Sequence, residues 1–169
     1  MIYIQICHDS KGKTTALNIL AGMHNASSGV ALVSGYDVHT ELNSVYERLG
    51  NCPQFECVWK DQSVQRHLEF YARLKGINDP RAAALNIATA VGLGEPEVYT
   101  RLSGALSGGM RRRLSIAVSL LGSPNTLLLD EPTTGKSHFI GTRVDQSQVH
   151  TDLRFCLHLS YRIRPFYKE

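Results

Sequence analysis

Long apolar runs are absent from this sequence. No stretch approaches the roughly 18 apolar residues that a membrane-spanning helix needs, which excludes such a helix within these residues. The amino end lacks a basic segment followed by an apolar core, so we expect no secretory signal. Internal repeats and low-complexity tracts are missing as well, which leaves an ordinary globular chain.

Cysteine is scarce and irregularly spaced. The four cysteines are Cys7, Cys52, Cys57 and Cys156. Cys52 and Cys57 lie near each other in the sequence, but no second pair completes a zinc site. We therefore expect reduced, mostly buried thiols in a cytosolic setting.

Charge is modest too. The net charge is +3, and arginines 111–113 and residues 162–168 supply much of it, so charge alone does not indicate a nucleic-acid partner. Apolar residues make up 43% and charged residues 20%, which is enough to bury a core. The length of 169 residues suits one domain, or a domain with a small subdomain. We expect no linker before Thr134.

The most informative stretch is residues 106–134, LSGGMRRRLSIAVSLLGSPNTLLLDEPTT. A Ser-Gly-Gly turn opens a predicted helix that runs to residue 121. The glycines leave backbone N–H groups uncovered at the amino end of this helix, which suits a phosphate. A glycine-rich turn without a ligand is the alternative. We expect the arginines at 111–113 to form a solvated face.

Two adjacent acids end the same stretch. An apolar strand is predicted over residues 125–129, and Asp130 and Glu131 follow it. Carboxylates at the carboxyl end of a buried strand are what magnesium-nucleotide chemistry requires, because ligands of open α/β sheets bind at that edge. Two acids at a strand end can serve as a metal ligand and a general base. Alternatively, they simply cap a loop.

A second phosphate signal lies near the amino end. A strand is predicted over residues 2–7, a tight loop over 8–15 and a helix over 16–22. Gly-Lys-Thr at a strand-to-helix junction is typical of a phosphate-binding loop. Lys13 supplies a positive charge, and Thr14 supplies a hydroxyl for magnesium.

This loop departs from the usual pattern at two positions. Cys7 and Ser10 stand where the common forms of the motif have glycine. A side chain resists the positive φ or the close backbone approach of such positions by about 1–2 kcal/mol per residue. An ordinary Lys-Gly-Lys turn is the alternative interpretation of this segment.

The region between these stretches has two halves. In the first, we predict a strand at 30–33 closed by Ser34-Gly35, a helix at 41–49 and a short extended segment at 50–53, with Gln54 as a solvated loop residue.

The second half, residues 61–102, is predicted to be a helical subdomain inserted into the sheet domain. One helix covers 63–75 and a second covers 79–91. The predicted apolar face and core packing involve Val64, Leu68, Phe70, Tyr71 and Leu74.

Together these motifs resemble the nucleotide-binding domain of an ABC transporter. Gly-Lys-Thr-Thr at 12–15, Cys-Pro-Gln at 52–54, LSGGM at 106–110 and LLLDEPT at 127–133 have the order and rough spacing of that family. LSGGMRRRLSIAVSLLG, together with LEFYARLKG at 68–76, is similar to the A subfamily, which is associated largely with lipid transport. The resemblance implies an α/β fold with a P-loop NTPase-type sheet core and an inserted helical subdomain, here incomplete.

The resemblance also implies roles for individual residues. ATP would be bound by Asp9, Ser10, Lys11, Gly12, Lys13, Thr14, Thr15 and Gln54, with Lys13 on the β- and γ-phosphates. Magnesium would be held by Thr14, Gln54 and Asp130. Glu131 would be the catalytic base that orients the attacking water. The signature Leu106, Ser107, Gly108 and Gly109 would bind the nucleotide of a second domain.

The implied cofactors are ATP and Mg²⁺, and the implied function is ATP hydrolysis that powers transmembrane transport. The implied partners are a second nucleotide-binding domain, head to tail, and transmembrane domains on the same parent chain or another chain. The chain would act at the cytoplasmic face of a membrane. No nucleic acid is expected as a partner.

The resemblance covers residues 2–135. The family's first strands and its adenine-stacking aromatic residue lie before the phosphate loop, so we expect a truncated amino end. After Gly135 the acidic D-loop is replaced by Lys-Ser-His-Phe, and residues 136–169 form a divergent tail without assignment. His158 is a weak candidate for the switch histidine. An alternative exon, a frameshift or a gene-model error is our hypothesis for the tail.

Two other functions compete with the transporter. One is a non-catalytic nucleotide-binding fragment or decoy, which the altered phosphate loop favours. The other is a soluble ABC ATPase that acts on DNA or ribosomes, which the charge distribution does not favour.

Overall fold

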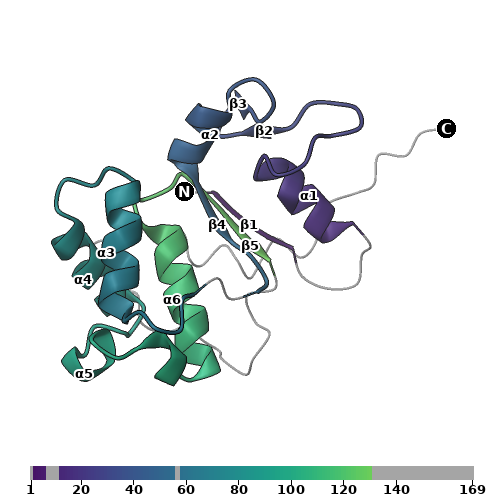
Figure 1. Ribbon diagram of the computed structural model, residues 1–169. Helices are drawn as coiled ribbons and strands as arrows, with labels where there is room; N and C mark the ends of the chain where they lie inside the picture. Colours follow the sequence, from purple (N-terminus) through teal and green to yellow (C-terminus); the bar gives the residue numbers. More distant parts are fainter. Residues whose placement is uncertain (1, 7–11, 56–57, 131–169) are drawn as a thin grey trace.

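The computed structural model describes residues 2–6, 12–55 and 58–130 (Figure 1). Strands and helices are mixed along the chain, with a run of helices before the last strand. In chain order they are β1 (Ile2–Ile6), α1 (Lys13–Leu20), β2 (Leu32–Val33), β3 (Tyr36–Asp37), α2 (Leu42–Arg48), β4 (Leu49–Cys52), α3 (Val64–Leu74), α4 (Pro80–Ala90), α5 (Pro96–Tyr99), a 3₁₀ turn (Ser103–Ala105), α6 (Gly108–Leu120) and β5 (Thr126–Asp130).

The main sheet is parallel, with the strand order β1-β5-β4. Ile6 pairs with Asp130, and Cys52 pairs with Leu129, so the three strands end at nearly the same level. All five residues of β5 are buried, as expected for the central strand of a parallel sheet. The carboxyl ends of β1, β4 and β5 therefore lie at one edge of the sheet.

The two faces of this sheet are covered by different helices. Leu128 packs with Leu17 of α1, whereas Leu127 and Leu129 pack with Ile116 of α6. This alternation follows from the two-residue period of a strand. Figure 1 shows α1 and α6 on either side of the sheet. Gly50 allows α6 to approach β4 closely, because a Cβ at this position would collide with the Ser119 carbonyl.

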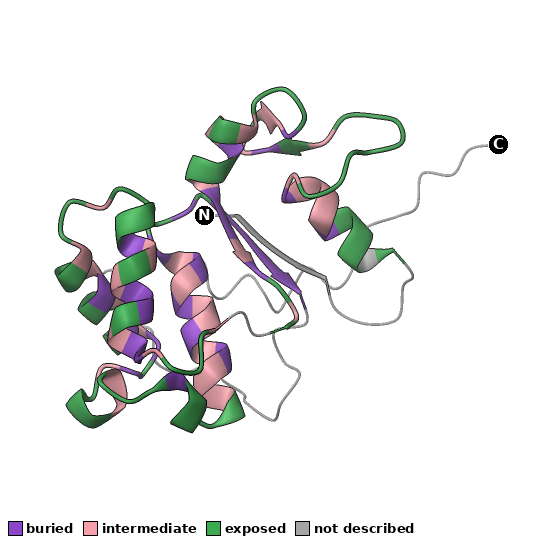
Figure 2. Ribbon diagram, in the orientation of Figure 1, coloured by how far each residue is buried: buried purple, intermediate pink, exposed green. Residues whose placement is uncertain are grey.

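A second core lies among α3, α4 and α6. Leu68, Ala84, Ala88, Leu114 and Ala117 are all fully buried within it. Alanines at the contact let the helix backbones lie close together. Figure 2 shows the helices buried on the sides that face one another and exposed on their outer sides. Helix α6 contributes side chains both to this helical core and to the packing against the sheet, so it joins the two.

The two long helices of this layer begin as predicted. Ser63 Oγ accepts a hydrogen bond from the Arg66 N–H at 3.2 Å, and Asp79 Oδ1 accepts one from the Ala82 N–H at 3.0 Å. Gly76, with φ of 68°, follows the end of α3 and takes the left-handed conformation that favours glycine. The predicted helices at 63–75 and 79–91 are confirmed.

Other predictions need correction. The helix predicted from residue 16 begins at Lys13. Ser34 and Gly35 have φ of 52° and 88°, so they do not merely close a strand but turn the chain into the β2-β3 hairpin. On α3, Leu74 is 66% exposed and Phe70 is 44% exposed, so neither belongs to the core as predicted.

Candidate functional site

The carboxyl edge of the sheet brings Thr14 and Asp130 together, although 116 residues separate them in the sequence. Thr14 lies in the first turn of α1, and its Oγ1 donates a hydrogen bond to Asp130 Oδ2 at 3.4 Å. Asp130 is the last residue of β5 and is buried. A hydroxyl and a carboxylate thus converge where the sequence predicts a magnesium site.

The amino end of α1 is open toward the same edge. Gly12 is the N-cap residue and has a φ of 97°, which only glycine adopts readily. Within the described part of the chain, no side chain caps this helix end. The uncovered N–H groups and the helix dipole favour an anion there. Lys13 is the first helical residue, so its backbone lies at this position.

These donors fit magnesium. Hydroxyl and carboxylate oxygens are hard ligands, and Mg²⁺ is usually held by one or two such protein groups together with water and phosphate oxygens. Among the described residues no cluster of three histidines, cysteines or acids would cage another metal. Thr14 and Asp130 would hold Mg²⁺, and phosphate oxygens would complete its coordination.

Gln54 follows β4 by two residues and is partly exposed. Its carbonyl oxygen lies 3.4 Å from Nη1 of Arg112. Nη2 of the same guanidinium donates to the Asp130 carbonyl oxygen at 2.8 Å. The main chain of Gln54 is thereby tied to the end of β5.

The surroundings of Arg112 differ from those that the sequence predicts. The prediction of a solvated face at 111–113 is wrong for it, because Arg112 is only 7% exposed. A helical spacing of four residues puts it in line with Ile116 and Leu120, which pack against the sheet. That spacing was the available signal, because it extends the sheet-facing stripe of α6 back to Arg112.

The signature residues lie at the start of α6. Leu106 is buried and anchors the segment, and the exposed Ser107 is the N-cap. Ser107 Oγ accepts a hydrogen bond from the Met110 N–H at 3.3 Å. Gly108 is exposed and Gly109 is partly exposed, so the turn is accessible from outside. It belongs to the helix that covers the face of the sheet opposite α1.

Several predicted positions lie outside the described residues. They include Asp9, Ser10 and Lys11 of the phosphate loop, Glu131 as the catalytic base, and His158 with the tail. Their roles stay predictions from the sequence.

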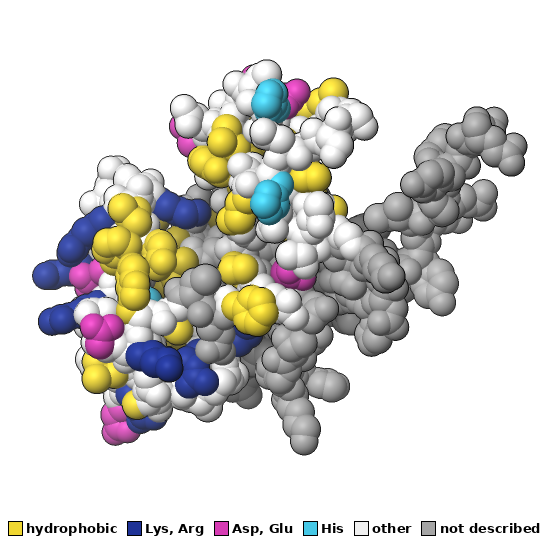
Figure 3. Space-filling view, turned by 45° about the vertical axis from the view of Figure 1, so that its right-hand side comes forward, with side chains coloured by type: hydrophobic (Ala, Val, Ile, Leu, Met, Phe, Trp, Pro, Cys, Tyr) yellow, Lys and Arg dark blue, Asp and Glu magenta, His cyan; other side chains and the backbone are white. Residues whose placement is uncertain are grey.

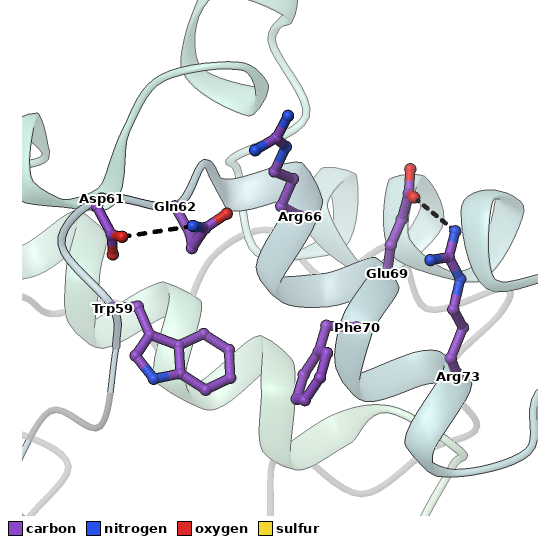
Figure 4. Close-up of a pocket in the computed structure, with 7 residues that line it drawn as sticks. All are labelled: Trp59, Asp61, Gln62, Arg66, Glu69, Phe70 and Arg73. Carbon is purple, nitrogen blue, oxygen red and sulfur yellow. Dashed lines mark hydrogen bonds and ion pairs between the residues drawn. The ribbon is translucent and has the colours of Figure 1, made fainter.

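A separate hollow of about 590 Å³ lies beside α3 (Figure 4). Trp59 and Phe70 form its aromatic part, with the two rings edge to face at 5.1 Å between centroids. Glu69 and Arg73 form an ion pair at 3.3 Å on its rim. Figure 3 shows hydrophobic side chains beside lysine and arginine side chains on the helical part of the molecule. This surface therefore combines aromatic and charged side chains.

In the ranges that the structure describes, no helix combines the length and the apolar character that spanning a membrane requires.

Comparisons with known proteins agree with the motifs. The family model described as "ABC transporter" matches residues 8–134. ABC transporter A family member 4 of Dictyostelium discoideum is 42% identical over 132 residues, covering 75% of this chain and 8% of its own length. ABC transporter A family member 12 of Arabidopsis thaliana is 42% identical over 126 residues, covering 73% of this chain and 14% of its own length.

A solved structure has a similar fold. It is described as a dimeric post-hydrolysis state of the ATP-binding cassette MJ0796 bound to ADP and Pi. The TM-score is 0.65 at 21% identity, and the alignment covers 75% of this chain and 59% of the other. The predicted fold class is confirmed. The chain spans less than a fifth of the length of the curated relatives it matches. From its motifs and these matches, the chain belongs to the ABC transporter family, and the relatives it matches are members of the A subfamily.

Proposed function

We propose that this chain binds and hydrolyses ATP as the nucleotide-binding domain of an A-type ABC transporter that moves lipids. The contact between Thr14 Oγ1 and Asp130 Oδ2 at 3.4 Å carries the proposal, because it brings the two motifs together at one edge. Family membership and the A-family names of the relatives support it.

Each residue has a role in this proposal. The backbone of residues 9–15 and the amino end of α1 bind the phosphates, and Lys13 neutralises their charge. Thr14, Gln54 and Asp130 would hold magnesium, which would neutralise phosphate charge when bound. Glu131 accepts hydrogen bonds from the attacking water and takes its proton.

The proposed partners are of two kinds. A second nucleotide-binding domain would receive Ser107 and Gly108, since the signature turn is accessible and its helix covers the face opposite α1. The transmembrane part would contact the hollow at Trp59 and Phe70, which follows Gln54 closely in the chain. This arrangement puts the chain at the cytoplasmic face of a membrane.

Magnesium-dependent nucleotide binding tests the proposal. We expect ATP to bind the 169-residue chain more tightly with Mg²⁺ than with EDTA, by calorimetry. Thr14→Ala and Asp130→Asn should reduce the gain from Mg²⁺ by on the order of 10- to 100-fold, because each removes a ligand oxygen. Thr40→Ala, an exposed turn residue, is the control. Equal affinity with Mg²⁺ and EDTA in the unmodified chain would contradict the site.

Turnover separates the transporter ATPase from its non-catalytic alternative. We expect Glu131→Gln to keep ATP affinity and to lower the hydrolysis rate by roughly 10²- to 10⁴-fold, because the water loses its base. If the chain binds ATP but shows no hydrolysis that Glu131→Gln abolishes, the result would instead support a nucleotide-binding fragment or decoy.

A further inference from the structure

The guanidinium of Arg112 joins the ends of two strands. Nη1 donates to the carbonyl oxygens of Pro53 and Gln54, and Nη2 donates to that of Asp130 at 2.8 Å. The first two acceptors follow β4, and the third ends β5. One side chain of α6 therefore contacts the main chain at two of the three proposed magnesium ligands.

The position of these contacts is explained by Pro53. The β4-β5 ladder has its last paired register at Cys52 and Leu129. Pro53 has no N–H group, so it cannot donate the next hydrogen bond of a ladder. Just beyond the last paired residues, the guanidinium donates hydrogen bonds to carbonyl oxygens of both strands' ends and so links β4 to β5 where the ladder stops.

Burying Arg112 costs more free energy than a purely structural role requires. Its charge is buried, and among the described residues no carboxylate forms an ion pair with it. Its buried Nε finds no hydrogen-bond partner in the part of the chain that the structure describes. A buried cation that is held only by carbonyl oxygens costs desolvation energy that a well-packed apolar residue would avoid.

The neighbouring Arg113 gives a comparison on the same helix. Its Nη1 donates to the Gly92 carbonyl oxygen at 3.1 Å and lies 3.5 Å from that of Val91. It therefore ties α6 to the end of α4, away from the sheet edge. Both arginines donate hydrogen bonds to main-chain carbonyl oxygens, but only those of Arg112 lie at the ends of β4 and β5.

We propose that Arg112 is a positioning residue: its fork sets the spacing between Gln54 and Asp130 and so the affinity of the site for magnesium. The inference rests on the proposed function.

The test compares ATP affinity with Mg²⁺ and with EDTA in the full chain. In Arg112→Gln we expect the gain from Mg²⁺ to fall about tenfold. Affinity in EDTA should change less than twofold. Arg112→Lys keeps the charge but lacks the fork, so it should not restore the gain. Arg113→Gln should keep the full gain, even though it also loses carbonyl contacts.

Other results would overturn the inference. A full magnesium gain in Arg112→Gln or Arg112→Lys, or an equal loss in Arg113→Gln, would make Arg112 only structural. If both Arg112 variants fail to fold, the unmodified chain decides: an exchange-protected guanidinium ¹⁵N resonance should shift when Mg²⁺ is added to the ATP complex, and no shift refutes the proposal. An unmodified chain that binds no ATP overturns the proposed function itself.

Discussion

At the scale of single residues, His67 shows how burial fixes a protonation state. Its Nε2 accepts a hydrogen bond from the Trp59 N–H at 2.8 Å, so its Nδ1 carries the proton and donates to the Ser63 carbonyl oxygen at 2.9 Å. Burial lowers the pKa of His67 below its ordinary value of 6.5. The Ser63 hydrogen bond and the charge of Asp61 oppose this shift but do not cancel it.

This lowered pKa predicts a loss of stability in mild acid. Well above pH 6.5 His67 is neutral in both the folded and the unfolded chain, and its full contribution to stability is present. As the pH falls from 6.5 toward the lower folded pKa, the unfolded chain takes up the proton more readily, so unfolding becomes easier by at most about 1.4 kcal/mol per pH unit. Urea unfolding between pH 7.5 and 5 measures this slope.

Two variants assign the slope to His67. His67→Gln should lower stability overall but flatten its pH dependence in this range, because the titrating group is gone. Thr40→Ala, at an exposed position without a titratable side chain, should leave the slope unchanged. An unchanged slope in His67→Gln would show that another group causes the acid sensitivity.

Individual residues differ in how far the sequence predicts them. Motif spacing indicates that Thr14 and Asp130 act together, and the structure brings them within 3.4 Å; their catalytic roles stay predictions. Arg112 was misassigned because a charged residue among three arginines is usually solvated. Its acceptors are main-chain carbonyls of two distant strands, and the identity of side chains does not reveal which carbonyls lack partners.

At the scale of elements, α3 offers a matched pair of leucines. Leu68 is fully buried, whereas Leu74 is 66% exposed on the same helix. We expect Leu68→Ala to lower the free energy of unfolding by about 2–5 kcal/mol, because it removes buried atoms and leaves a cavity. Leu74→Ala should cost within about 0.5 kcal/mol. Chemical denaturation of both variants checks this prediction. Similar losses in the free energy of unfolding for the two variants would contradict it.

Helices with clear caps were predictable, whereas short or context-dependent elements were not. Ser63 and Asp79 signal helix starts through their own side chains. The four-residue helix α5 has too few residues for a periodic pattern. In the β2-β3 hairpin, Ser34 adopts a positive φ that its residue type does not favour, so packing and the turn decide the conformation together.

At the scale of the whole molecule, the sheet separates the two nucleotide-related helices. Leu128 faces the side with α1, and Leu127 and Leu129 face the side with α6. The proposed phosphate-binding end belongs to α1, and the signature turn belongs to α6. This separation is consistent with a signature that serves the nucleotide of another copy rather than its own.

Mixing two inactive variants tests this arrangement. Lys13→Ala removes the phosphate-binding charge, and Ser107→Arg blocks the signature turn, so each variant alone should hydrolyse little ATP. In a head-to-tail pair the mixed dimer has one composite site with both defects and one with neither. Random pairing makes half of the dimers mixed, so mixing should restore about a quarter of the unmodified activity. If Ser107 served the nucleotide of its own chain, every site would keep one defect, and mixing would restore nothing.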